Sequence, residues 1–350
     1  MKSPFGRRVG RAVYYLRNIA RDSAPQIIFR SRQNAIVGRT HQYDADYLSW
    51  RLNYYNRLSE CVQGGPYSST VSSIPMSKSM YYYDLKEHAR YFPRHLKLNH
   101  LFGDLRYVPD NPSIVKSRPI AGDNRNSVIM KLVKFRNFYF PTDRRPFTDK
   151  RPVAVWRGGQ NNPKRLELVR LYHSHPLCDV GHTHGPKNDL SHRQFLQPAE
   201  QMEFKYIISI EGNDMATNLK WILASNSLCL QPKPEIETWF MEGRLEAGRH
   251  YVELRDDFAD LEEKILYYER HPDEAMEIIR NANAHVAQFL DSEREQLLSL
   301  LVLCKYFVLT GQIAADPAWA DLIMSRTEGA PIARPAAQMS SAPGRWDQGQ

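Results

Sequence analysis

Apolar and polar residues are arranged so that short strands alternate with helices over the second half of the chain. Brief apolar runs are bounded by glycine or polar turn residues, and the segments after them carry apolar residues at helical spacing. The predicted strands cover residues 153–156, 206–210, 228–230 and 251–254, and the predicted helices cover residues 164–172, 216–224, 261–268, 273–290 and 292–310. This alternation predicts βαβ units and an α/β fold.

The pattern is weaker in the first half of the chain. It predicts helices over residues 44–62 and 127–138, and it does not decide between strand and helix over residues 81–92. Residues 2–32 hold eight basic residues and one acidic residue, with apolar residues between them. Such a segment fits contact with an anionic membrane surface, and a solvated basic arm fits it equally well.

The length of 350 residues predicts two domains of ordinary size. We expect a basic arm over residues 1–40, an N-terminal lobe over 41–150 and a C-terminal lobe over 151–290. A helical segment follows over residues 291–325, and a tail over 326–350, rich in Ala, Pro, Ser and Gly, is expected to be disordered. Four widely spaced cysteines and the lack of a long apolar stretch predict a cytoplasmic protein, and the basic segment 2–32 adds the alternative of a peripheral position on the inner face of the membrane.

The formal net charge of +8 favours an anionic partner. Nucleic acid is one such partner to consider, because 19 tyrosines could stack on its bases. The basic residues are spread along the chain, however, and no RNA- or DNA-binding motif is present, so we expect no nucleic-acid partner. A non-catalytic carbohydrate-binding protein is a second alternative.

Residues 206–227 carry the strongest local signal for a ligand site. A predicted strand leads to Gly212, and Asn213 and Asp214 could cap a following helix whose free N–H groups would face an anion. Lys220 would add a positive charge one or two turns into that helix. An ordinary βαβ corner with a solvated lysine explains the same pattern about equally well.

Arginines and carboxylates recur near other predicted turns. Arg157 ends a strand and Arg165 begins a helix, where both could meet a diphosphate, or Arg157 could form a structural salt bridge. Asp104 is followed by Lys116 and Arg118, so a carboxylate able to accept a proton lies near cations, although Asp104 alone could be a turn residue.

Two acidic residues and two possible metal-binding motifs are further candidates for a functional site. Glu237 and Glu242 flank an aromatic pair and could accept hydrogen bonds from ribose hydroxyls, or could be helix-start charges. Asp44-Ala45-Asp46 is a DxD motif, but helix capping explains it better. A zinc site built from Cys178, His182 and His184 would lack a fourth ligand, so no metal site is expected.

Six motifs in order make the chain resemble glycosyltransferase family 90 over about residues 80–290. They are GDLRYVP, IVKSRPI, AVWRGG, YIISIEGNDMATNLKWILASNS, ETWFMEG and HYVELRDDFADLEEKI. The family includes bacterial lipopolysaccharide core sugar transferases and eukaryotic protein O-glucosyltransferases. The resemblance implies a GT-B fold, in which two Rossmann-like lobes face a cleft, here with C-terminal helices added. It also implies that the lobe over residues 41–150 is the acceptor-side lobe and that the lobe over 151–290 binds the nucleotide-sugar.

The resemblance also implies an inverting, metal-independent transfer of a hexose or pentose from a nucleotide-sugar, by family a UDP-sugar, to a saccharide such as lipopolysaccharide core. No cofactor is implied, because the nucleotide-sugar is a co-substrate. Asp104 matches the family's base, and Lys116 and Arg118 lie on the acceptor side or near phosphate. The positions expected at the donor are Arg157, Gly158, Arg165, Gly212, Asn213, Asn218, Lys220, Ser225, Glu237 and Glu242. Asn218 stands where eukaryotic relatives carry an arginine, so Lys220 or Arg165 is expected to supply that charge.

Overall fold

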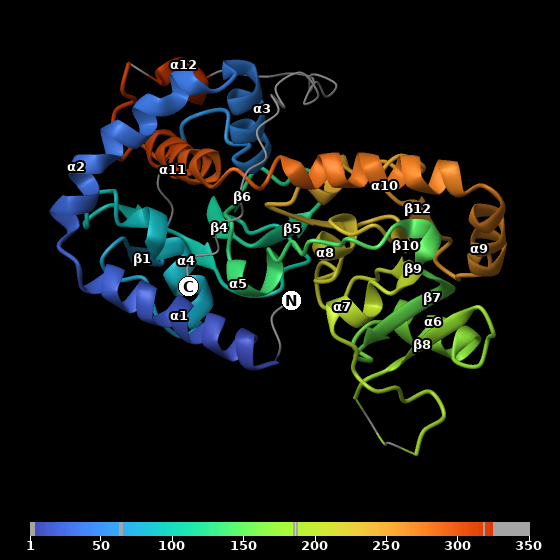
Figure 1. The fold of residues 1–350 in the computed structure, drawn as a ribbon. Coiled ribbons are helices and arrows are strands. Elements are labelled where there is room, and N and C mark those ends of the chain that lie inside the picture. Colours follow the sequence, from blue (N-terminus) through green and yellow to red (C-terminus); the bar gives the residue numbers. More distant parts are fainter. Residues whose placement is uncertain (1–3, 63–65, 185, 187, 318, 325–350) are drawn as a thin grey trace.

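The computed structural model describes residues 4–62, 66–184, 186, 188–317 and 319–324. Figure 1 shows two regions side by side, one with helices around a small sheet and one with a larger sheet and its own helices. The combination of helices and parallel strands confirms the predicted α/β class. The larger sheet begins at Arg151.

The larger sheet has five parallel strands in the order β12-β10-β9-β7-β8. Its strands are β7 (Arg151–Gly158), β8 (Cys178–His182), β9 (Phe204–Ile208), β10 (Leu228–Gln231) and β12 (Val252–Glu253). Counted along the chain from the β8 edge, this is the doubly wound order 2-1-3-4-5. Because the order reverses between β7 and β9, a ligand crevice is expected there, beyond the carboxyl ends of the strands.

Alternate residues of these strands pack into two different apolar layers, one on each face of the sheet. The first layer, which includes side chains of α6 (Pro163–Tyr172) and α9 (Leu261–Arg270), contains strand residues Ala154, Trp156, Tyr206, Ile208, Leu228 and Leu230. The second, which includes side chains of α8 (Leu219–Leu223) and α10 (Pro272–Ala287), contains Val155, Ile207 and Cys229. The sheet is therefore buried on both faces, which explains the nearly continuous apolar runs of its strands.

The other region is built on a three-stranded parallel sheet in the order β3-β4-β6. Its strands are β3 (His100–Leu101), β4 (Ser113–Val115) and β6 (Ser127–Ile129). The helices of this region are α1 (Pro4–Ser23), α2 (Gln26–Val37), α3 (Ala45–Tyr55), α4 (Ser79–Ala89), α11 (Ser292–Leu309) and α12 (Ala320–Met324). The last long helix, α11, contacts α2, α3, α4 and α12.

Short elements complete the fold. An antiparallel pair joins β1 (Ser69–Thr70) and β2 (Lys97–Leu98), and a second joins β5 (Ser117–Pro119) to β11 (Ile236–Thr238). The remaining helices are α5 (Lys134–Asn137), α7 (Pro198–Gln201) and 3-10 turns at Gly38–Gln42, Phe147–Asp149 and Glu242–Arg244. The β5–β11 pair links a strand of the first region to the segment that connects β10 and β12 of the larger sheet.

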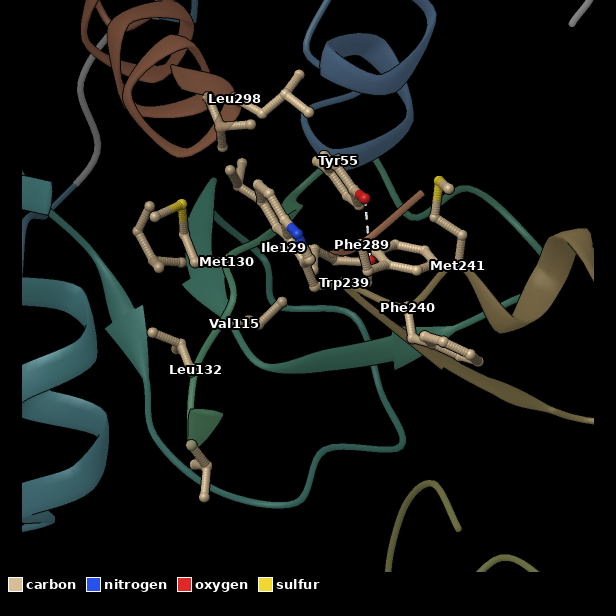
Figure 2. Packing of buried hydrophobic residues seen from close by; sticks show 14 of the residues in the cluster. Tyr55, Val115, Ile129, Met130, Leu132, Trp239, Phe240, Met241, Phe289 and Leu298 are labelled. Carbon is tan, nitrogen blue, oxygen red and sulfur yellow. Dashed lines mark hydrogen bonds between the residues drawn. The ribbon is translucent and has the colours of Figure 1, made fainter. Parts of the chain in front are cut away.

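A shared apolar core also joins the two regions. Figure 2 shows Trp239 stacked on Tyr55 of α3, with ring centroids 3.8 Å apart and the Tyr55 hydroxyl donating to the Trp239 carbonyl at 2.9 Å. Phe240 and Met241 are likewise fully buried, and Leu298 of α11 belongs to the same cluster. The ETWFMEG motif therefore anchors one region in the other.

Several sequence-based expectations need correction. The predicted helix over residues 127–138 is wrong, because Val128 and Ile129 lie in the buried strand β6 and a left-handed Val133 precedes the short helix α5. A short apolar run fits a buried strand as well as a helix, and the pairing with β4 decides it. The helix predicted over residues 44–62 ends at Tyr55, and residues 81–92, left undecided, are mostly helical in α4.

The predicted basic arm is helical, because residues 4–23 form α1 and residues 26–37 form α2. None of the helices within the described ranges is both long and apolar enough to cross a membrane. The predicted tail over residues 326–350 lies outside the described residues.

Candidate active site

A pocket lies beyond the carboxyl ends of β9 and β10, beside the point where the strand order reverses. The space between its lining atoms amounts to about 510 Å³, and part of that space is open to solvent. Its walls come from the segments after β9 and β10, the start of α6, Arg106 from the loop after β3, and Glu242. The topology of the sheet thus places a pocket where doubly wound sheets bind ligands.

Three cationic side chains line this pocket. Arg106 pairs with Glu211 at 3.2 Å and with Glu235 at 2.7 Å. Lys164 pairs with the same Glu235 at 3.0 Å, whereas Lys233 has no ion pair within the described part of the chain. Because Glu235 is half exposed and serves two cations, an anionic ligand could replace it as their partner.

Arg165 braces the turn that forms one wall of the pocket. Its guanidinium donates to the carbonyl oxygens of Glu211 at 3.0 Å and Ile210 at 2.8 Å. A β-carbon on Gly212 would lie 3.0 Å from Arg165 Nη2, so this close approach favours glycine. Asn218 ties the same segment to β9 by donating to the Ile208 carbonyl at 3.1 Å. The predicted residues Arg165, Gly212 and Asn218 therefore shape the wall of the pocket.

Asp104 belongs to a charged cluster on the other side of this turn. Lys116 Nζ contacts Asp104 Oδ1 at 2.5 Å and Asp214 Oδ2 at 2.7 Å, and Ser117 donates to Asp214 at 2.8 Å. The Asp104 side chain keeps 41% of its surface exposed, and it also bonds the side chain of Asn213. The structure thus brings Asp104, Lys116 and Asn213 together.

Lys116 controls the protonation of Asp104. Burial alone would raise the pKa of the Asp104 carboxyl, but the hydrogen bond from Lys116 and its charge outweigh burial and lower that pKa below its ordinary value. Asp104 is therefore ionised at neutral pH, which is the form that can accept a proton.

Lys220 lies behind the pocket and does not line it. Its side chain is fully buried and pairs with Glu242 at 2.8 Å, while Glu242 also accepts hydrogen bonds from the Thr238 backbone and hydroxyl. The helix that holds Lys220 begins at Leu219 with Asn218 at its N-cap, so the prediction that Asn213 and Asp214 cap it is wrong. Those two side chains instead contact the Asp104 cluster.

Arg157 also has protein partners away from the pocket. It pairs with Asp179 at 2.7 Å and donates to the Gln194 carbonyl at 3.0 Å, which matches the structural alternative stated for it. Gly158 ends β7, and a β-carbon there would clash with the Trp156 ring at 2.5 Å. Ser225 is buried and donates to the Ile222 carbonyl at 2.7 Å. None of these three residues lines the pocket.

Arg118 and Glu237 form a buried pair across the β5–β11 ladder. Arg118 Nε contacts Glu237 Oε1 at 2.7 Å, and its Nη atoms donate to the carbonyls of Ser127 and Tyr54. The Tyr54 hydroxyl contacts Glu237 as well. This carboxylate thus holds the two regions together, and Glu242 alone of the two predicted glutamates reaches the pocket.

The DxD motif that begins at Asp44 lies at the start of a helix. Asp44 caps α3 by accepting from the Tyr47 N–H at 2.7 Å, which confirms the capping interpretation. Across the described residues, no three His, Cys, Asp or Glu side chains are grouped closely enough to hold a metal ion.

Sequence reasoning missed Arg106, Lys164, Lys233 and Glu235. Arg106 lies two residues after Asp104 within a motif that was singled out, and Lys164 lies just before the predicted Arg165. Both signals were present, but a charged residue in a loop or at a helix start looks solvated until its tertiary neighbours are known.

Comparisons with known proteins agree with the motifs. The family described as Glycosyl transferase family 90 matches residues 131–328, more than half of the chain. The chain is 49% identical over 261 residues to "O-glucosyltransferase LpsA" of Dichelobacter nodosus, covering 74% of this chain and 82% of that protein.

More distant relatives match over shorter stretches. Identity to "Protein O-glucosyltransferase 3" of Homo sapiens is 27% over 165 residues, which covers 45% of this chain and 32% of that protein. Identity to "Protein O-glucosyltransferase 2" of Danio rerio is 29% over 137 residues, or 36% and 26% of the two chains. On this evidence the chain belongs to glycosyltransferase family 90.

Proposed function

We propose that this glycosyltransferase moves glucose from a UDP-sugar to a hydroxyl group of a saccharide acceptor, with inversion at the anomeric carbon and without a metal ion. The observation that carries the proposal is a cation-lined pocket at the reversal point of a doubly wound sheet, separated from the ionised Asp104 by one turn. Glucose is proposed because the LpsA relative is named an O-glucosyltransferase.

The pocket suits a nucleoside diphosphate. Arg106, Lys164 and Lys233 offer positive charge to the two phosphates, and exchange of Glu235 for the diphosphate would preserve the pairing of the first two. Apolar walls from residues such as Ile210, Met215 and Pro232 suit the nucleoside. These three cations, and not Arg157 or Lys220, would therefore stabilise the leaving diphosphate.

The acceptor would approach from the side of Asp104. Its hydroxyl oxygen forms a bond to the anomeric carbon while the bond from that carbon to the diphosphate oxygen breaks, and the hydroxyl proton passes to the Asp104 carboxylate. The charge that grows on the diphosphate is stabilised by the fixed cations of the pocket. Opposite approach and departure of the two oxygens gives inversion.

The proposal includes a GT-B arrangement, with the region around β3-β4-β6 as the acceptor lobe and the region around the larger sheet as the donor lobe. In support, Arg106 reaches the pocket from the first region while the other lining residues follow or flank the larger sheet. We further propose lipopolysaccharide core as the acceptor and the cytoplasm as the compartment, in keeping with four free cysteines.

A panel of nucleotide-sugars tests the proposal. The purified chain should release UDP from UDP-glucose when a truncated core saccharide is present, and NMR of the product should show an inverted anomeric centre. Mass spectrometry of the surface glycolipid, from cells with and without the protein, should differ by one hexose. Failure to release a nucleoside diphosphate from any donor would favour the non-catalytic alternative.

Lys164→Ala should lower kcat/KM for the donor by about tenfold to a hundredfold, because it removes a charged contact to the diphosphate worth about 1.5–3 kcal/mol. Steady-state kinetics with varied UDP-glucose measures this effect. Arg170→Ala is a matched control, since Arg170 lies on the same helix and pairs only with Glu167 among the described residues. Equal activity of the two variants would exclude Lys164 from donor binding.

Treatment with a chelator should leave the transfer rate within about twofold of the untreated rate, because protein cations supply the stabilisation that a divalent ion supplies elsewhere. The measurement compares UDP release after dialysis against EDTA with release after addition of Mn²⁺ or Mg²⁺. Activity that disappears on dialysis and returns with either ion would contradict metal independence.

A further inference from the structure

Helix α1 turns an apolar face outward. Val9, Val13 and Leu16 recur at helical spacing and so share one side of the helix, and Leu16 is 67% exposed. Ile19 is also exposed, and Ala12 and Ala20 lie between these residues on the helical projection. No described residue covers this side, which we call the α1 apolar face.

The opposite side of α1 fixes the helix to α4. The Tyr14 hydroxyl donates to Asp84 at 2.8 Å, the Tyr15 hydroxyl lies 3.0 Å from the Ser79 hydroxyl, and Asn18 is buried. The rings of Tyr14 and Tyr15 on this side also pack against the core. Aromatic packing and hydrogen bonds therefore fix the orientation of α1, and that orientation leaves its aliphatic residues on the outside.

Arginines border the α1 apolar face. With 100° between successive residues, Arg8 and Arg17 fall on its two edges, and neither forms an ion pair within the described chain. The single acidic residue of this segment, Asp22, is turned inward, where it accepts from Tyr82 at 2.6 Å. The outward side of α1 therefore combines exposed aliphatic groups with positive charge.

We propose that α1 lies on an anionic lipid surface, with the α1 apolar face at the boundary of head groups and acyl chains. Arg8 and Arg17 can extend along the edges of this face to lipid phosphates while their methylene stems stay in contact with it. The positive border complements an anionic plane, which favours lipid over a protein partner. This attachment does not depend on which sugar the enzyme transfers.

Vesicle sedimentation with the full chain tests the proposal. The chain should bind vesicles that contain phosphatidylglycerol, bind phosphatidylcholine vesicles much less, and dissociate as salt is raised. Leu16→Glu should weaken binding at least about tenfold, because it places a charge in the apolar face. Arg8→Gln with Arg17→Gln should weaken binding by about fivefold for each arginine replaced.

Leu266→Glu is the matched control, because Leu266 is an exposed leucine on α9, outside the α1 apolar face. It should bind like the unaltered chain, and all variants should keep the same thermal midpoint. Equal binding of Leu16→Glu and Leu266→Glu, or no binding to anionic vesicles, would overturn the proposal. A dimer lost in Leu16→Glu, without vesicle binding, would also overturn it and assign the face to a second copy.

Discussion

Replacing Asp104 with asparagine is expected to lower kcat by about 10²–10⁴-fold, because the proton of the acceptor hydroxyl then has no carboxylate to receive it. The fold should survive this change, since Lys116 keeps its contact with Asp214 at 2.7 Å. Single-turnover and steady-state measurements of UDP release, together with thermal unfolding, check both expectations. KM for the donor should change little, because Asp104 does not line the pocket.

Asp110→Asn provides the control, because Asp110 is an exposed carboxylate on the same loop. It should retain full activity. The pH profile gives a second check: Asp104 accepts a proton only when ionised, and its pKa is lowered, so kcat/KM should show no loss from this group between pH 7 and about pH 5. An acid limb near pH 6 that persists in Asp104→Asn would identify another base.

Replacing Lys220 with methionine is expected to lower the free energy of unfolding by about 3–5 kcal/mol, because Glu242 would remain buried without its cation. Urea denaturation measures the change. Lys205→Met is the control: that ion pair is more exposed, so the loss should stay within about 1 kcal/mol.

The double variant Lys220→Met with Glu242→Gln separates structure from catalysis. Removing both charges should restore most of the lost stability. If Lys220 serves only this pair, KM for the donor in the double variant should stay near its original value. A stable double variant whose donor KM rises tenfold or more would place the Lys220–Glu242 pair, through Glu242 in the pocket wall, in donor binding.

The larger sheet could be predicted from the sequence because both of its faces are buried. Runs such as 153–156 and 206–210 are then apolar at nearly every position, with Ser209 as the exception, and glycine or polar residues mark where they end. An apolar run also explains why the helix predicted over residues 127–138 is wrong. Val128 and Ile129 are apolar in either a strand or a helix, and only the ladder with β4, a contact distant in sequence, makes them a strand.

The candidate site could be predicted only in part, because a sequence shows charges without their partners. Arg118, Lys220 and Glu237 all have the residue types of a ligand site, yet tertiary contacts place them in buried ion pairs. Arg106 and Lys164 looked like ordinary surface charges, and only the folding of their loops brings both to Glu235. The motif order was informative about the family and not about these pairings.

Helix α11 follows the larger sheet in the sequence and is followed within the described residues by the short helix α12, yet it packs among α2, α3 and α4. Its buried leucines complete the interior of the first region, so that region cannot finish folding until about three hundred residues have been synthesised. During translation α2, α3 and α4 therefore remain incompletely packed while the larger sheet is synthesised. The order of the two regions in the sequence therefore differs from the order in which they can complete their folding.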